Sequence, residues 1–181
     1  MIKLLDLLKE DSPFVPRGSK EEREQDYNRV LQNKIQEYIK NGSKGDLDLS
    51  YTSITSLPSN LTKVGGDLYL SFTKITSLPN NLTVGGDLDL SFTNIISLPS
   101  NLTVGDFLNL NPTPITSLPD NLSVGALNIS NSNITSLPSN LNVKDYIDMY
   151  NTPLSKKYSE DEIRAMVKDL EGKNFKGYIN M

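Results

Sequence analysis

The middle of the chain alternates apolar and polar residues in short pairs of the form Leu-x-Leu. A period of two places both apolar side chains of a pair on one side of a β-strand, so each pair predicts a short strand with one buried face. After each of the first five pairs, an Ile follows at the fifth position and a Leu-Pro step comes three residues later, which predicts further buried positions on a return path. The pairs are Leu47/Leu49, Leu68/Leu70, Leu88/Leu90, Leu108/Leu110, Leu127/Ile129 and Ile147/Met149.

This unit repeats along residues 45–154, in five full copies and one truncated copy. Its prolines recur after 21, 20, 20 and 19 residues, at Pro58, Pro79, Pro99, Pro119 and Pro138. A fixed period of this length predicts a solenoid in which stacked coils align their strands into one parallel sheet. Proline and the short return leave no room for a full helix on the opposite side, which we expect to be extended or 3-10.

Residues 1–44 predict a helical cap on the first coil. Ser19 and Glu22 form a capping-box pattern that starts a helix at Lys20, and Gly42 ends it after Asn41. Apolar residues recur along it every three or four positions, so one stripe of the helix would cover the first strand. The stripe consists of Tyr27, Val30, Leu31, Ile35, Tyr38 and Ile39.

Residues 2–10 predict a separate short amphipathic helix that ends before Pro13. Its apolar positions are Ile2, Leu4, Leu5, Leu7 and Leu8. Two roles remain open for this helix. Either it packs on the first coil, or it detaches and inserts into a groove on a partner.

Residues 155–181 predict a second helical cap over the last coil. Ser159 and Glu162 form another capping-box pattern, and Gly172 closes the helix that follows it. We expect Phe175 and Tyr178 to pack back against this helix, and the final residues to form a short strand. The apolar face of the helix consists of Ile163, Met166, Val167 and Leu170.

The period of roughly 20 residues and the Leu-Pro return resemble the leucine-rich repeats. The resemblance is to the short bacterial class seen in type III secretion effectors and to small repeat proteins of tailed phages. It implies an α/β solenoid that winds as a right-handed superhelix, with the parallel sheet on its concave face and an irregular convex side. Resemblance to the ubiquitin-ligase effectors ends at the repeats, because those enzymes carry a catalytic Cys in a helical domain and this chain has no Cys.

Two departures from the family pattern change the expected coil. Hydroxyl residues replace the Asn of the family ladder, and a hydroxyl satisfies only part of what an amide does for neighbouring backbones. These residues are Thr52, Thr73, Thr93, Thr113, Ser132 and Thr152. In addition, Gly65, Gly85 and Gly105 replace the leading Leu, which predicts a tight turn entering the strand.

The charge of the chain is concentrated in the repeats. The formal net charge is -4, made up of -6 over residues 46–154 and +1 over each flank. An acidic array cannot neutralise phosphates, so a nucleic-acid partner is not expected. The chain has no Cys and no His, which removes disulfides, thiolate nucleophiles and imidazole bases. Every Asp in the array recurs with the repeat or stands alone, so we expect no catalysis and no cofactor.

The N-terminal residues do not form a signal peptide, because Asp6 interrupts the apolar run and no small-residue cleavage site follows. No apolar stretch reaches the length of a membrane-spanning helix. A chain without Cys fits a reducing compartment. We therefore expect a soluble protein of the cytoplasm, and the resemblance extends this to the cytoplasm of a phage-infected bacterium.

The outward positions of the predicted strands are acidic and aromatic. Adjacent strands lie about 4.8 Å apart, so Asp46, Asp67 and Asp87 would repel one another by roughly 0.9 kcal/mol per neighbouring pair, and stability alone would not favour them. The face is either a solvated acidic surface or a dock for a basic protein surface, with divalent-cation binding as a third reading. Its residues are Asp46, Asp48, Asp67, Tyr69, Asp87, Asp89, Phe107, Asn109, Ala126, Asn128, Tyr146, Asp148 and Tyr150.

A second row follows the strand ends, where Tyr51, Phe72 and Phe92 recur with the repeat. These rings either stack on one another as a structural ladder or form part of an interface. Three functions remain open at this point. The chain is a protein-binding module, a structural component of a phage or bacterial assembly docked through residues 2–10, or an effector that sequesters a basic host protein.

Overall fold

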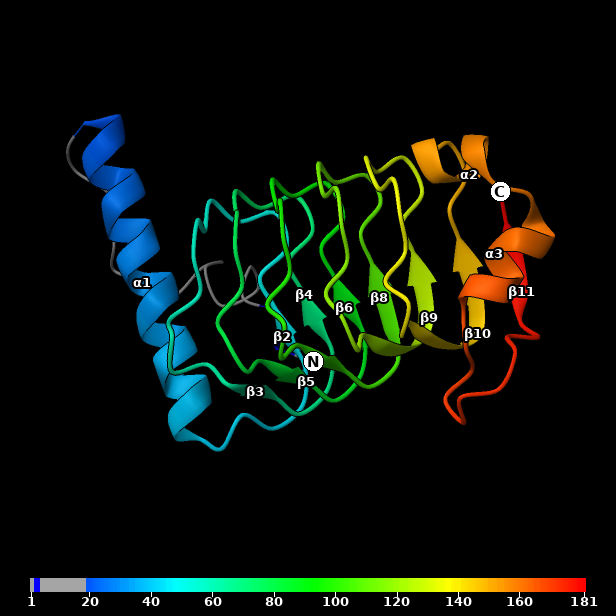
Figure 1. Ribbon diagram of the computed structural model, residues 1–181. Coiled ribbons are helices and arrows are strands. Elements are labelled where there is room, and N and C mark those ends of the chain that lie inside the picture. Colours follow the sequence, from blue (N-terminus) through cyan, green and yellow to red (C-terminus); the bar gives the residue numbers. More distant parts are fainter. Residues whose placement is uncertain (1, 4–18) are drawn as a thin grey trace.

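The computed structural model describes the protein at residues 2–3 and 19–181. The repeats wind into a parallel-strand β-solenoid, with one short strand per coil in an eight-stranded sheet (Figure 1). Leu47, Leu68 and Leu88 pair in register and continue into Leu108, Leu127 and Ile147, so the predicted stack of coils is confirmed. In sheet order the strands are β1 (Ile2–Lys3), β2 (Leu47–Asp48), β4 (Leu68–Tyr69), β6 (Leu88–Asp89), β8 (Phe107–Asn109), β9 (Ser123–Asn128), β10 (Asn142–Asp148) and β11 (Tyr178–Asn180).

A second parallel sheet lies on the return path, where the sequence predicted only extended or 3-10 structure. It consists of β3 (Lys63–Val64), β5 (Thr83–Val84) and β7 (Thr103–Val104). The Val of each strand is buried and the residue before it is more exposed, which is a strand pattern only two residues long. No 3-10 helix occurs in the part of the chain that the structure describes. Two residues are too few for alternation to reveal a strand in advance.

The hydroxyl row is buried and bonds within each coil. The hydroxyl of Thr73 donates to the carbonyl of Leu70 at 2.7 Å, and Thr93 donates to Leu90 at 2.6 Å. Thr52, Thr113, Ser132 and Thr152 make the same bond to the residue three positions earlier. The hydroxyl thus closes the turn of its own coil, in accordance with its single donor.

The glycines before the strands serve close packing between coils. Gly65, Gly85 and Gly105 were predicted to form tight turns, but none of them has a positive φ. A Cβ on Gly85 would lie 2.3 Å from the carbonyl oxygen of Gly65, and one on Gly105 would lie 2.1 Å from that of Gly85. Adjacent backbones therefore approach too closely here for any side chain.

Helix α1 (Lys20–Lys40) lies at one end of the solenoid (Figure 1) and agrees with the predicted helix. The capping box between Ser19 and Glu22 is present. Leu31 and Ile35 are fully buried in the same apolar core as the coils. The hydroxyl of Tyr38 also donates to the carbonyl of Gly45 at 2.8 Å, so the helix is joined to the first coil by both apolar and polar contacts.

The predicted helix over residues 2–10 is wrong at its start. Ile2 and Lys3 form β1, which pairs in parallel with β2 opposite Leu47 and Asp48. A sheet edge exposes unpaired main-chain groups, and a short strand that satisfies them is favoured over a turn of helix. Residues 4–10, and with them the rest of this prediction and its docking role, lie outside the described residues.

The C-terminal segment forms two short helices and a strand. Helix α2 (Pro153–Lys157) was not predicted, and α3 (Glu160–Met166) ends before the expected stop at Gly172. After α3 the chain becomes extended, because Lys168 exchanges main-chain hydrogen bonds with Leu141 and Val143 of the last coil. Phe175 is buried and β11 forms, as predicted, whereas Tyr178 is exposed and does not pack against the helix. None of the helices within residues 19–181 combines the length and hydrophobicity that crossing a bilayer requires.

Candidate functional site

The strand register brings the predicted surface residues together in two rows on the outward face of the sheet, here called the sheet face. The first row precedes the inward Leu or Ile of each strand, and the second row follows it. In order along the sheet, the first row is Asp46, Asp67, Asp87, Phe107, Ala126, Tyr146 and Tyr178. The second row is Lys3, Asp48, Tyr69, Asp89, Asn109, Asn128, Asp148 and Asn180.

The carboxylates of the first row join successive coils. Oδ1 of Asp46 accepts a hydrogen bond from the main-chain N–H of Asp67 at 3.0 Å, and Oδ1 of Asp67 accepts one from Asp87 at 2.8 Å. Asp87 in turn accepts from the N–H of Phe107 at 3.0 Å. A hydrogen bond to a charged group contributes about 1.5–3 kcal/mol, which offsets part or all of the repulsion between neighbouring carboxylates. Each carboxylate of this row therefore has a structural role that the sequence did not predict.

The Gly-Gly-Asp sequence gives these carboxylates their space. A Cβ on Gly66 would lie 2.1 Å from Oδ1 of Asp46, and one on Gly86 would lie 2.0 Å from Oδ1 of Asp67. The second glycine of each Gly-Gly-Asp thus sits directly against the carboxylate of the preceding coil. Sequence reasoning missed this contact because it joins residues of two successive coils.

The second row holds the ends of the strands. Oδ1 of Asp48 accepts from the N–H of Ser50 at 3.0 Å, and Oδ1 of Asp89 accepts from the N–H of Ser91 at 2.9 Å. Asn109, Asn128 and Asp148 make the same bond to the residue two positions later. Asp and Asn side chains form such turns readily, so these positions have a local structural role whatever they bind.

Tyr69 is the only aromatic residue among the sheet-face residues of the first three coils of the array, where the other five are aspartates. Its hydroxyl donates to Oδ2 of Asp67 at 2.8 Å. This hydrogen bond, with smaller contributions from burial and from the charges of Asp67, Asp46 and Asp87, raises the pKa of Tyr69 to about 12. The phenol therefore stays a neutral donor.

One carboxylate oxygen of each remaining acidic residue on the sheet face faces solvent without a partner among the described residues. Oδ1 of Asp46, Asp48, Asp87, Asp89 and Asp148 is engaged as described, and no described residue donates to their Oδ2 atoms. Ion pairs within residues 19–181 join other groups, such as Arg29 with Asp26 and Arg164 with Glu160. The register places one basic residue, Lys3, beside Asp48 at the edge of this half, so the acidic half of the sheet face keeps an excess of negative charge.

Aromatic side chains occupy the other half of the first row. The rings of Phe107 and Tyr146 have centroids 5.9 Å apart, and Ala126 lies between them in the register. Ala126 occupies the predicted outward position in the register but is only 8% exposed, because two large neighbours meet across its small side chain. Burial, followed by the charges of Asp148 and Asp87, raises the pKa of Tyr146.

Tyr178 and Tyr150 extend the aromatic half, with 68% and 57% of their surface exposed. Tyr178 pairs in register with Tyr146, and sequence reasoning left it out of the face. A signal was available, because Tyr178-Ile179-Asn180 repeats the pattern Tyr146-Ile147-Asp148 of the last array strand.

A third row, here called the corner row, follows the strand ends. Its first three members, Tyr51, Phe72 and Phe92, form the aromatic row, in which ring centroids are 4.8 and 4.3 Å apart and the planes are within 11° of parallel. All three residues have left-handed backbones, with φ of 58°, 57° and 55°. For a non-glycine residue this conformation costs roughly 1–2 kcal/mol, about as much as ring stacking contributes.

The corner row continues with polar side chains in the later coils. Asn131 and Asn151 have φ of 53° and 56°, in the same region as the aromatic residues. Their amides form a ladder, in which Asn151 donates to Asn131 at 2.9 Å and Asn131 donates to Asn111 at 3.1 Å. The same backbone conformation is thus combined with stacked aromatic rings in the early coils and with an asparagine ladder in the later ones.

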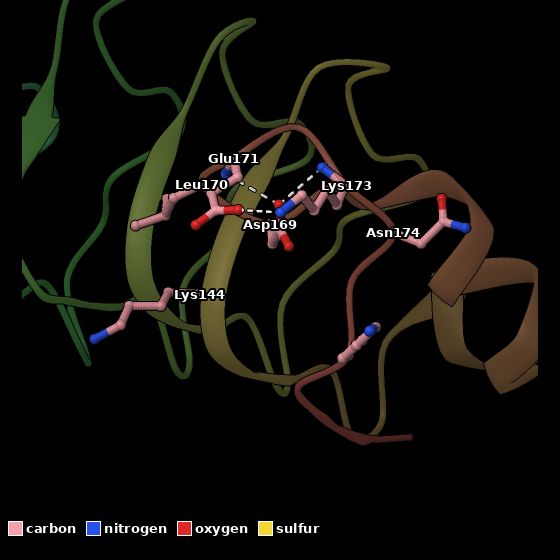
Figure 2. A pocket seen from close by; sticks show the side chains of 7 residues that line it. Lys144, Asp169, Leu170, Glu171, Lys173 and Asn174 are labelled. Carbon is pink, nitrogen blue, oxygen red and sulfur yellow. Dashed lines mark hydrogen bonds and ion pairs between the residues drawn. The ribbon is translucent and has the colours of Figure 1, made fainter.

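A pocket of about 670 Å³ lies by the C-terminal loop (Figure 2). Oδ1 of Asp169 accepts from the N–H groups of Glu171 and Lys173, and the side chains of Glu171 and Lys173 form an ion pair. The polar groups of this loop therefore satisfy one another and do not converge on the cavity. The pocket is lined by Lys144, Asp169, Leu170, Glu171, Lys173, Asn174 and Lys176.

Metal-binding geometry is not present in the part of the chain that the structure describes, where no three acidic side chains converge on one point. The chain matches no family model, and a search of curated proteins finds no significant match. The sheet face and the aromatic row are the features of the described residues that support a binding function.

Proposed function

We propose that the protein is a non-catalytic binding module of leucine-rich-repeat type, which holds a basic surface of another protein against its sheet face. The observation that carries this proposal is the set of Oδ2 atoms on Asp46, Asp48, Asp87, Asp89 and Asp148, which are not buried and accept no hydrogen bond from a described residue. Lys3 is the register neighbour of Asp48 at the edge of the sheet, and the other carboxylates lie on the strands beyond it. Opposite charge on a partner would be attracted and oriented by such a surface.

The rigidity of the face supports the same function. Each acidic side chain is fixed by a main-chain hydrogen bond, either to the next coil or to its own turn. Side chains that are already ordered lose little conformational entropy on binding, so the free-energy cost of forming the interface is lower. The aromatic half, with Phe107, Tyr146 and Tyr178, adds the residue types that interface centres favour.

The ends of the module act as caps in this proposal. Leu31 and Ile35 of α1 cover one end of the apolar core, and Ile163 and Phe175 are buried at the other. A solenoid needs such ends because each coil contacts only its neighbours and the terminal coils would otherwise expose their core. We also propose that the sheet forms the concave face of the solenoid and that the protein acts in the cytoplasm.

The test is capture of partner proteins from native extract by immobilised protein. We expect Asp46→Asn, Asp87→Asn and Asp148→Asn together to abolish capture, because asparagine keeps the Oδ1 acceptor that the fold uses and removes the charge. A control with Glu21→Gln, Asp120→Asn and Asp161→Asn changes the net charge equally at exposed positions away from the sheet face. Capture should also fall as salt rises from low to physiological concentration and above. Equal capture by both variants would disprove the role of the sheet face.

A further inference from the structure

Aromatic residues and asparagines occupy equivalent positions in the corner row. Tyr51, Phe72 and Phe92 adopt the same left-handed backbone as Asn131 and Asn151. Asparagine tolerates this conformation well, whereas a bulky aromatic residue rarely adopts it. Asparagine therefore suits the left-handed backbone of the corner better than an aromatic residue does, and it occupies this position at Asn131 and Asn151. Three consecutive aromatic choices in the early coils are not required by the backbone.

The aromatic row is also left open to solvent. The side chains of Tyr51, Phe72 and Phe92 are 67%, 45% and 54% exposed. Because the rings stack on one another in two contacts, four of their six faces are covered, and ring edges make up much of the exposed surface. Stacking of a base or a sugar needs an open ring face, so this arrangement does not suit such ligands. A ridge of ring edges suits apolar side chains from another protein.

The charge beside the aromatic row indicates which kind of partner segment could bind there. Asp48 and Asp89 of the second row precede Tyr51 and Phe92 by three residues, and each keeps one carboxylate oxygen free of described partners. An apolar segment that lies on the row would thus run alongside negative charge. Its own flank on that side must be basic to be attracted.

The backbone of the occupant can be inferred as well. Main-chain groups along the row are already paired between coils, as in the bonds from Tyr51 to Ser71 and from Phe72 to Ser91. An added strand would find no free partners here, whereas a helix satisfies its own main chain.

We propose that the aromatic row is a docking ridge for a basic amphipathic helix of a partner protein. Apolar side chains of that helix at positions i, i+3, i+4 and i+7 contact the ring edges, and Lys or Arg on the adjacent flank face Asp48 and Asp89. This inference rests on the proposed function, since it names the kind of segment that the acidic surface receives.

The probe is a synthetic helical peptide of about 18 residues with a Leu stripe and a flanking Lys stripe, compared with a scrambled peptide of the same composition. Fluorescence anisotropy measures both affinities. We expect the native protein to bind the amphipathic peptide at least about ten-fold more tightly than the scrambled one. Tyr51→Asn, Phe72→Asn and Phe92→Asn together should remove this difference, and circular dichroism should show that the fold is kept.

Ile96→Thr is the matched control. Ile96 is an exposed apolar side chain outside the corner row, at a position where the other full repeats have Thr. This variant should bind the amphipathic peptide as the native protein does. Equal affinity of the native protein for the two peptides, or unchanged binding by the triple asparagine variant, would overturn the docking ridge.

The two proposals fail differently. If the variant with Tyr51, Phe72 and Phe92 replaced by Asn still captures a salt-sensitive partner that the variant with Asp46, Asp87 and Asp148 replaced by Asn loses, the docking ridge is wrong and the binding function of the sheet face stands. If the acidic variant captures partners as the native protein does, the proposed function itself is wrong.

Discussion

The main-chain N–H of Asp87 donates a 2.8 Å hydrogen bond to Oδ1 of Asp67 in the preceding coil. The bond makes a surface carboxylate part of the scaffold, while Oδ2 of Asp67 accepts from Tyr69. An acidic row that looks purely functional in the sequence therefore also holds coils together. Structure and binding can be separated only by substitutions that keep one oxygen.

Asp67→Ala should lower the free energy of unfolding by about 1–3 kcal/mol, because the N–H of Asp87 loses its acceptor. Asp67→Asn should cost less, since its amide oxygen can still accept. Urea denaturation monitored by circular dichroism measures both values. Asp120→Ala, at an exposed position, should stay within about 0.5 kcal/mol of the native protein. An Asp67→Ala value as small as this control would show that the bond does not stabilise the fold.

Gly86→Ala should destabilise the protein because its Cβ would lie 2.0 Å from Oδ1 and 3.2 Å from Cγ of Asp67. Both atoms belong to one side chain, so the clash should be relieved when Asp67 is also replaced by Ala. A double-mutant cycle in urea should therefore give an interaction energy of about 0.5–3 kcal/mol. Additive effects of the two substitutions would mean that the carboxylate does not occupy this space.

Thr93→Val should lower the free energy of unfolding by about 1 kcal/mol, since it removes a buried hydroxyl that donates to the carbonyl of Leu90 at nearly constant volume. Thr76→Val is the control, because Thr76 occupies an exposed position of the neighbouring coil. Thermal and urea unfolding of the two variants measure the difference. Equal stability of both would contradict the role of the hydroxyl row in closing each coil.

Tyr69 should ionise later than an ordinary tyrosine, with a pKa of about 12. The folded state holds this proton more tightly than the unfolded state, so the contribution to stability is complete below about pH 10 and is lost as the pH rises towards 12. Absorbance titration at alkaline pH, with Tyr69→Phe subtracted from the native protein, isolates the group. Asp67→Asn should lower the pKa of Tyr69 because the charged acceptor is gone. An ordinary pKa in the native protein would refute the hydrogen bond.

Hydrophobic alternation was sufficient to predict the coils. The Leu-x-Leu pairs fix which side chains point inward, and the constant period fixes that Leu47, Leu68 and Leu88 stack. The two rows of the sheet face followed from the same register. The repeat period does not predict which atoms of successive coils contact one another. The contacts from Asp67 to Gly86 and to the N–H of Asp87 are thus visible only in three dimensions.

The flanks were harder to predict because they respond to the solenoid ends. The helical pattern of residues 160–171 continues past Met166, but the open main-chain groups of Leu141 and Val143 pair with Lys168 and stop the helix. Ile2 and Lys3 likewise pair with β2. In both places a free sheet edge overrides a local preference, and that edge exists only once the coils have formed.

Each coil closes its own corner, because the hydroxyl of Thr73 or Thr93 bonds to a carbonyl of the same coil. A duplicated unit would therefore bring its own corner with it, and a copy that contains Gly85-Gly86-Asp87 would also bring the contact between the second glycine and the Asp of the preceding coil. The chain can in this way grow or shrink by whole units, and each unit changes the length of the surface by one strand spacing of about 4.8 Å. Evolution could thus match the module to a longer or shorter partner by recombination alone, without inventing a new residue.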